Sequence, residues 1–182
     1  MKLLSLILTL LLASQITFGQ FQSLDKLIPP GFTILDSASG DFNRDSARDL
    51  IVILKNNYED SIPDTTRPLL LLLGNSNQQY MLLSRNDSVV LCKGCGGAFG
   101  DPYQGITIKN GYFSIEHLGG SRWRWTRIIT FKYDLKSKQF ILHRDAGDAW
   151  DDTKAHKSKE ELYNKEDFDK LAFDKYSNDK NW

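Results

Sequence analysis

The chain has 182 residues and carries 23 basic against 23 acidic side chains, so its formal net charge is zero. This balance leaves no long-range field to gather nucleic acid or an anionic membrane, and it excludes binding modes that depend on bulk charge. The length suits one domain with a substantial core.

Residues 1–19 are predicted to be a secretory signal peptide. Lys2 precedes the apolar stretch Leu3–Ala13, and Thr17-Phe18-Gly19 offers small residues near a cleavage point. The apolar stretch is shorter than the roughly 20 residues that span a bilayer, which argues against an uncleaved anchor. Cleavage would remove Lys2 from the 23 basic residues and leave 22 against 23 acidic ones, a net charge of −1. We therefore expect a secreted or periplasmic protein with no membrane span after cleavage.

Apolar runs predict β-strands in the first half of the chain, over residues 31–36, 50–54, 69–73, 80–85 and 88–92. The second and third of these runs are unbroken and end at turn residues, which is typical of central strands covered on both faces. Asn86-Asp87 predicts a turn between the last two strands. Residues 56–68 are polar and contain Pro63 and Pro68, and they predict an exposed loop.

An acidic motif lies between the first two of these strands. Oxygen-bearing side chains occupy positions one, three, five and nine of a short loop: Asp41, Asn43, Asp45 and Asp49. This spacing lets a loop curl its oxygens round one hard cation such as Ca²⁺, with a backbone carbonyl near Ala47 as a further ligand. Asp and Asn also form turns by hydrogen-bonding their own backbone, so a metal-free turn is the alternative interpretation.

The acidic motif resembles the calcium loops of FG-GAP and VCBS-type repeats, in which such a loop leads directly into a buried strand. The resemblance implies four side-chain ligands for Ca²⁺: Asp41, Asn43, Asp45 and Asp49. Ser46 stands where those families usually carry a glycine, and Arg44 and Arg48 offset part of the negative charge. The motif occurs once, so no repeat array is predicted. The wider chain also resembles a group of secreted bacterial proteins without known activity. This resemblance implies an exported protein and no particular activity.

Cys92 and Cys95 form a Cys-x-x-Cys pair ahead of a glycine-rich stretch. In an oxidising compartment the favoured interpretation is a small disulfide, or a pair of structural thiols. A redox role would need a thiolate of lowered pKa, typically at a helix N-terminus, and residues 96–102 are a poor helix start. A zinc site would need further ligands, which only His117, His143 and His156 could supply.

Two turns organise the second half of the chain. Asn110-Gly111 predicts a two-residue hairpin that pairs Ile108 with Phe113. Residues 119–121 are predicted to form a three-residue loop that pairs Ile115 with Trp125. A further strand over residues 140–144 would complete a four-stranded antiparallel meander.

Strand alternation places His117, Trp123, Trp125 and Arg127 on the inner face of this meander. The tryptophans are interpreted as core residues, with surface stacking of sugars or bases as the alternative. A charge at Arg127 must reach solvent or find an acidic partner, so Arg127 is a candidate contact for a ligand carboxylate or one half of an ion pair. His117 is a second possible ligand contact, with a hydrogen-bonded structural role as the alternative.

These patterns predict a mainly β fold over residues 20–182. The expected architecture is a single antiparallel β domain, a sandwich or open barrel, with a minor C-terminal helix over residues 158–163 and a frayed end over 177–182. The functional hypothesis is an exported, non-enzymatic binding module whose acidic loop takes Ca²⁺, with an unknown protein or small molecule as partner. The alternative is an exported enzyme, either a metal-assisted hydrolase or a thiol oxidoreductase using Cys92 and Cys95. No catalytic residue is assigned.

Overall fold

A computed structural model describes residues 20–153, 159–162 and 170–178. The predicted signal peptide lies outside these residues, as do parts of the C-terminal region for which a helix and a frayed end are expected. Within the described ranges, no helix combines the length and the apolar character needed to cross a membrane.

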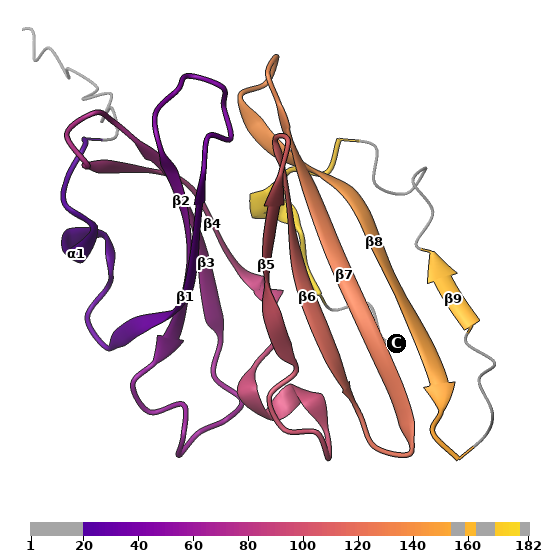
Figure 1. Ribbon diagram of the computed structural model, residues 1–182. Helices are drawn as coiled ribbons and strands as arrows, with labels where there is room; N and C mark the ends of the chain where they lie inside the picture. Colours follow the sequence, from indigo (N-terminus) through magenta and orange to yellow (C-terminus); the bar gives the residue numbers. More distant parts are fainter. Residues whose placement is uncertain (1–19, 154–158, 163–169, 179–182) are drawn as a thin grey trace, which may run out of the picture.

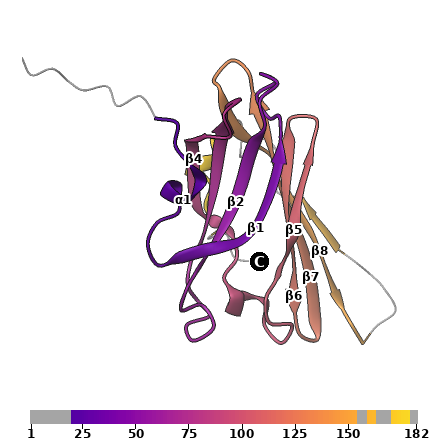
Figure 2. The ribbon, with the colours of Figure 1, turned by 60° about the vertical axis from the view of Figure 1, so that its left-hand side comes forward.

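The chain folds into two antiparallel sheets that face each other (Figures 1 and 2), which confirms the predicted β sandwich. The first sheet has the strand order β1 (Phe32–Gly40), β2 (Asp49–Asn56), β3 (Arg67–Gly74) and β4 (Tyr80–Val90). The second has the order β5 (Tyr103–Lys109), β6 (Tyr112–Gly120), β7 (Trp123–Asp134), β8 (Gln139–Asp151) and β9 (Lys159–Leu162). Each strand pairs with its neighbour in the sequence, so every connection within a sheet is local.

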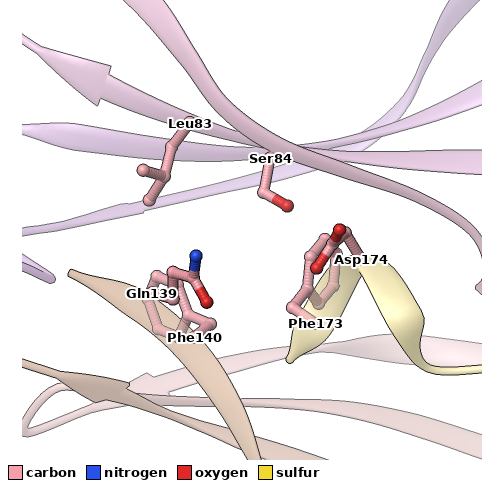
Figure 3. Close-up of a pocket in the computed structure, with 6 residues that line it drawn as sticks. All are labelled: Leu83, Ser84, Gln139, Phe140, Phe173 and Asp174. Atoms are coloured by element: carbon pink, nitrogen blue, oxygen red, sulfur yellow. The ribbon is translucent and has the colours of Figure 1, made fainter. Parts of the chain in front are cut away.

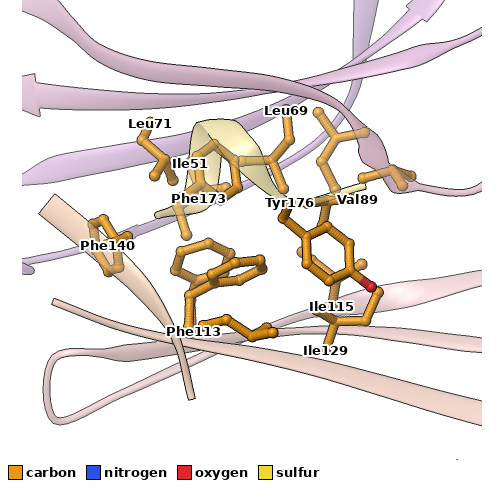
Figure 4. Close-up of a cluster of buried hydrophobic side chains, with 14 of the residues drawn as sticks. Ile51, Leu69, Leu71, Val89, Phe113, Ile115, Ile129, Phe140, Phe173 and Tyr176 are labelled. Carbon is orange, nitrogen blue, oxygen red and sulfur yellow. The ribbon is translucent and has the colours of Figure 1, made fainter. Parts of the chain in front are cut away.

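The core lies between the two sheets. Ile51 and Leu69 of the first sheet belong to one buried cluster with Phe113 and Ile129 of the second (Figure 4). The alternate residues of β2 and β3 face the other way, where Val52, Leu54, Leu70 and Leu72 pack against the short helix α1 (Leu24–Leu27) and its neighbours. Both strands are therefore covered on both faces, which explains and confirms their unbroken apolar runs.

Residues 170–178, here called the strap, run along the open edge between β4 and β8. Phe173 and Tyr176 are buried in the inter-sheet core, and the strap contains the 3-10 turn η3 (Phe173–Lys175). Leu142 N donates to Leu171 O at 2.8 Å. The strap thereby closes the edge of the sandwich with apolar side chains from far along the chain.

The helix expected over residues 158–163 is wrong where the structure describes it. Residues 159–162 form β9, an edge strand paired antiparallel with β8. The short segment Lys-Glu-Glu-Leu has good helix formers, but strand pairing along β8 overrides that local preference. Among the C-terminal residues that the structure describes, the helical content is the short turn η3.

The second-half hairpins follow the prediction at one turn and depart from it at the next. Ile108 pairs with Phe113 as expected, and Asn110 and Gly111 take the positive φ values, 53° and 79°, that the two-residue turn requires. The β6–β7 register is wrong in the prediction, because β6 runs on through the glycines and Ile115 pairs with Ile129, not Trp125. The displacement is an even number of residues, so the assignment of side chains to faces is unchanged.

Trp123 departs from its expected core position. The strand alternation is right, yet the side chain is 60% exposed because it lies at the very start of β7, where strand pairing begins. Trp125 is half-buried. A residue on the inner face of a sheet is covered only where the opposite sheet reaches it.

The turn predicted at Asn86-Asp87 is also wrong, because β4 continues through both residues. Asn86 Oδ1 accepts hydrogen bonds from Ser88 N at 2.7 Å and Val89 N at 2.9 Å, and this contact accompanies a register shift against β3. Asn86 Nδ2 donates to Phe173 O at 2.6 Å and Tyr176 O at 2.8 Å. The side chain thus fastens the strap.

We predict that Asn86→Ala lowers the free energy of unfolding by about 3 kcal/mol, because it leaves two strap carbonyls and two strand amides without their buried partner. Urea denaturation of the mature protein measures the change. The matched control is Asn77→Ala, since Asn77 is exposed in the β3–β4 turn and should leave stability nearly unchanged. Equal midpoints for Asn86→Ala and the wild type would contradict the assignment.

Candidate functional site

The acidic loop between β1 and β2 curls back on itself. The amide of Asp45 lies 3.1 Å from both Asp41 Oδ1 and Asn43 Oδ1, so these two oxygens converge on one donor. Asn43 Nδ2 donates to Asp45 Oδ2 at 2.8 Å. The amides of Ser46 and Ala47 donate to the carboxylates of Asp41 and Asp45 at 3.1 Å and 2.8 Å. Asp41, Asn43 and Asp45 therefore all accept hydrogen bonds from the loop's own backbone amides, and Asn43 and Asp45 are also bonded side chain to side chain.

Ser46 takes the conformation that a glycine would supply. Its φ is 68°, in the left-handed region, and Arg44 has a φ of 64°. A non-glycine residue enters this region at a cost, which is offset where surrounding hydrogen bonds hold the chain. The missing glycine therefore does not prevent the sharp turn that the sequence pattern requires.

Asp49 closes the base of the loop. Its side chain is fully buried, with Oδ2 accepting from Phe42 N at 2.9 Å and Oδ1 accepting from Gly74 N at 3.0 Å. Burial raises the pKa of this carboxyl, the two amide hydrogen bonds lower it, and the charge of Asp45 raises it again, with a net rise. Asp49 thus joins the loop to β2 and to the end of β3.

The donor set suits a hard cation. A carboxylate offers about four lone-pair positions and an amide oxygen two, so each of these side chains keeps acceptor capacity after its hydrogen bonds within the fold. Oxygen ligands on a short flexible loop are what Ca²⁺ takes. Within the described ranges, no three His, Cys, Asp or Glu side chains are already grouped around a common point. Ligation of an ion by all four predicted residues stays a prediction.

Cys92 and Cys95 form a disulfide, with their Cα atoms 5.1 Å apart. It spans the 3-10 turn η1 (Lys93–Gly96), too short to provide a helix N-terminus that would lower a thiol pKa. Cys92 Sγ lies 3.6 Å from the carboxylate of Asp64, whose negative charge disfavours a thiolate. The local environment therefore favours the structural interpretation of the pair.

A buried arginine anchors the loop that carries the disulfide, and the sequence analysis missed it. Arg67 has no exposed surface, and its guanidinium bonds Glu59 at 2.5 and 3.0 Å and Asp101 at 2.6 Å through two nitrogens. Glu59 was expected in an exposed loop but is 4% exposed. The available signal was a charged residue at the very start of the apolar run of β3, which requires buried partners.

His117 of β6 and Arg127 of β7 are cross-strand neighbours in the second sheet, and both are buried. Arg127 makes a buried ion pair with Asp145 at 2.8 and 2.6 Å and donates to Tyr176 Oη at 3.0 Å and to Asn178. This is the acidic partner that its inner-face position demands. The candidate role of Arg127 in contacting a ligand stays a prediction.

His117 is 2% exposed, and its Nε2 accepts a hydrogen bond from Leu91 N at 3.2 Å. Its Nδ1 has no hydrogen-bond partner among the described residues. Burial, together with the positive charges of Arg127 and Arg67, lowers the pKa of His117 to about 3. The imidazole is therefore neutral at physiological pH, and its role as a ligand contact stays a prediction.

A small pocket of about 130 Å³ lies beside the strap (Figure 3). Its lining residues are Leu83, Ser84, Gln139, Phe140, Phe173 and Asp174. Asp174 is paired with Lys175 at 3.0 Å. The pocket is well below the size of ordinary ligand sites and contains none of the predicted site residues.

Comparisons of the chain with protein-family models, with curated proteins and with solved structures each found no match.

We predict that stability falls on mild acidification because of His117. The pKa of His117 in the folded protein is below the unfolded value of about 6.5. Between these two values the unfolded chain binds a proton that the folded protein does not bind, which favours unfolding. The contribution of neutral His117 to the free energy of unfolding is fully present above about pH 7. The free energy of unfolding should decline by about 1 kcal/mol by pH 5.5, before carboxylates titrate. Urea denaturation at several pH values measures this slope.

The variant His117→Gln should flatten the slope between pH 7 and 5.5. Asn77→Ala is the control, because Asn77 is exposed and does not titrate, so its loss should leave the slope as it is. If His117→Gln retains the wild-type slope, another group carries the pH dependence.

We predict that replacing both Cys92 and Cys95 by Ser lowers the free energy of unfolding by about 2 kcal/mol, the loop-closure value for so short a ring. Thermal and urea unfolding measure the cost. The wild-type protein should not accelerate the reduction of insulin disulfides by a dithiol. Turnover in that assay, abolished by the double substitution, would instead support the oxidoreductase alternative.

Proposed function

We propose that the protein is an exported, non-enzymatic binding module in which Ca²⁺, or a similar hard cation, binds the acidic loop and orders one end of the sandwich. The ion would be held by oxygens of Asp41, Asn43 and Asp45, with Asp49 at the closed base of the loop. The observation that carries the proposal is the convergence of Asp41 and Asn43 oxygens on the Asp45 amide at 3.1 Å.

Electrostatics support the same proposal. The motif contains three aspartates within nine positions, and their mutual repulsion is offset only in part by Arg44 and Arg48. The raised pKa of Asp49 reflects burial together with the nearby charge of Asp45. A divalent cation at the loop would remove this repulsion, so ion binding and folding should stabilise each other.

The position of the loop suits a binding role better than a purely internal one. The acidic loop, the β5–β6 turn and the β7–β8 turn all lie at one end of the sandwich (Figure 1). Loops on a rigid β framework are where binding residues concentrate. A cation that fixes the acidic loop would therefore also fix the surface that this end presents.

We expect CaCl₂ to raise the melting temperature of the mature protein relative to the same sample in EDTA. At a free Ca²⁺ concentration 100 times the dissociation constant, linkage gives about 2.7 kcal/mol of added stability. Differential scanning calorimetry with Ca²⁺, Mg²⁺ and EDTA measures the effect and its preference for the larger ion.

The variant Asp45→Asn should melt at one temperature with and without Ca²⁺, since it removes a charged ligand and keeps the side-chain shape. Asp25→Asn is the matched control, because Asp25 is exposed on α1 and its loss should leave the response to Ca²⁺ intact. A wild-type midpoint that is the same in Ca²⁺ and in EDTA would remove the ion from the proposed function.

A further inference from the structure

A hollow of about 290 Å³ lies next to the acidic loop at the same end of the sandwich. It is lined by Phe42 and Arg44 of the loop, Asn110 and Gly111 of the β5–β6 turn, and residues 132–136 of the β7–β8 hairpin. Its size is near the lower limit of small-molecule sites, about 300 Å³. The hollow therefore suits a ligand of about one sugar ring.

Two cationic residues in this lining, Arg44 and Lys136, form no salt bridge among the described residues, although the charge of Lys136 acts on the nearby carboxylate of Asp134. Lys132 differs, because its ammonium lies over the Tyr112 ring, 5.4 Å from the centroid. Asp134 is the carboxylate in the lining, and its Oδ2 already accepts hydrogen bonds from Ser137 N at 2.9 Å and Ser137 Oγ at 2.7 Å. An anion is thus the ligand that Arg44 and Lys136 favour.

The acidic loop fixes the position of Arg44. Arg44 has a left-handed φ of 64° and stands between Asn43 and Asp45, whose side chains are bonded to each other. The backbone at Arg44 can therefore not rotate freely while the loop stays curled. An ion in the loop would hold this conformation and would also weaken the negative field that opposes an anion.

Phe42, Tyr133 and the exposed Leu135 form the apolar part of the hollow. The ring of Phe42 packs edge-on against Phe140 at 5.8 Å, and the ring of Tyr133 does the same at 5.2 Å. Tyr133 lines the hollow together with Phe42 and Arg44 of the acidic loop. A pyranose ring can lie against such an aromatic face while its hydroxyls meet polar groups such as the Asn110 amide.

We propose that this hollow binds a sugar acid, a pyranose-sized ring with one carboxylate. The carboxylate lies between Arg44 and Lys136, and the ring packs on Tyr133 and meets Asn110. The proposal deepens the function given above and rests on it in one respect, because Ca²⁺ in the acidic loop increases the affinity.

Isothermal titration of the mature protein in CaCl₂ with three probes tests the proposal: glucuronate, glucose and inorganic phosphate. Glucuronate should bind at least about tenfold more tightly than glucose, which has the same ring without the charge, and than phosphate, which has charge without the ring. Arg44→Gln and Lys136→Gln should each weaken glucuronate binding about fivefold, as for a partly exposed ion pair. Lys138→Gln, an exposed charge in the same turn outside the lining, should leave the affinity unchanged.

Three results would overturn the proposal: no glucuronate binding, equal affinity for glucose, or equal affinity for phosphate. Titration in EDTA separates it from the metal proposal. If Ca²⁺ raises the melting temperature but glucuronate does not bind, the sugar-acid site fails and the ion site stands. If glucuronate binds equally in Ca²⁺ and EDTA, with binding reduced in Arg44→Gln, the coupling to the ion fails and the sugar-acid site stands.

Discussion

The Asp49 carboxylate, fully buried at the start of β2, accepts hydrogen bonds from Phe42 and Gly74 and so joins three segments at one end of the sandwich. A carboxylate without such partners could not be buried there, because desolvation would cost several kcal/mol. The curl of the acidic loop starts from this closed base. The backbone conformation of Arg44, which lines the neighbouring hollow, belongs to this curl.

The same rule governs the interior far from the loop. Arg67 and Arg127 are both buried with carboxylate partners, and each joins segments distant in sequence: Arg67 connects Glu59 with Asp101, and Arg127 connects Asp145 with the strap. Such pairs fix which segments meet more than they add net stability. Both arginines act on His117 from within the interior, because their positive charges help to lower its pKa.

Sequence reasoning succeeded where the determining contacts are local. The apolar runs of β2 and β3 and the Asn110-Gly111 turn depend on neighbours within a few residues. It failed where the partner is remote. Asn86 looked like a turn residue because its partners, Phe173 and Tyr176, lie 87 and 90 residues away. For Arg67, the only feature visible in the sequence was a charged residue next to an apolar run, which does not identify Glu59 and Asp101 as its partners.

The most direct test of the central claim is a titration of the ¹⁵N-labelled mature protein with CaCl₂, observed by heteronuclear NMR. The account predicts saturable shifts, with one ion per chain, concentrated on the backbone amides of Asp45, Ser46 and Ala47, which the ligand carboxylates contact directly. Amides of the buried strands should move little. Unchanged loop amides at millimolar Ca²⁺ would contradict the account and leave the acidic loop as a self-bonded turn.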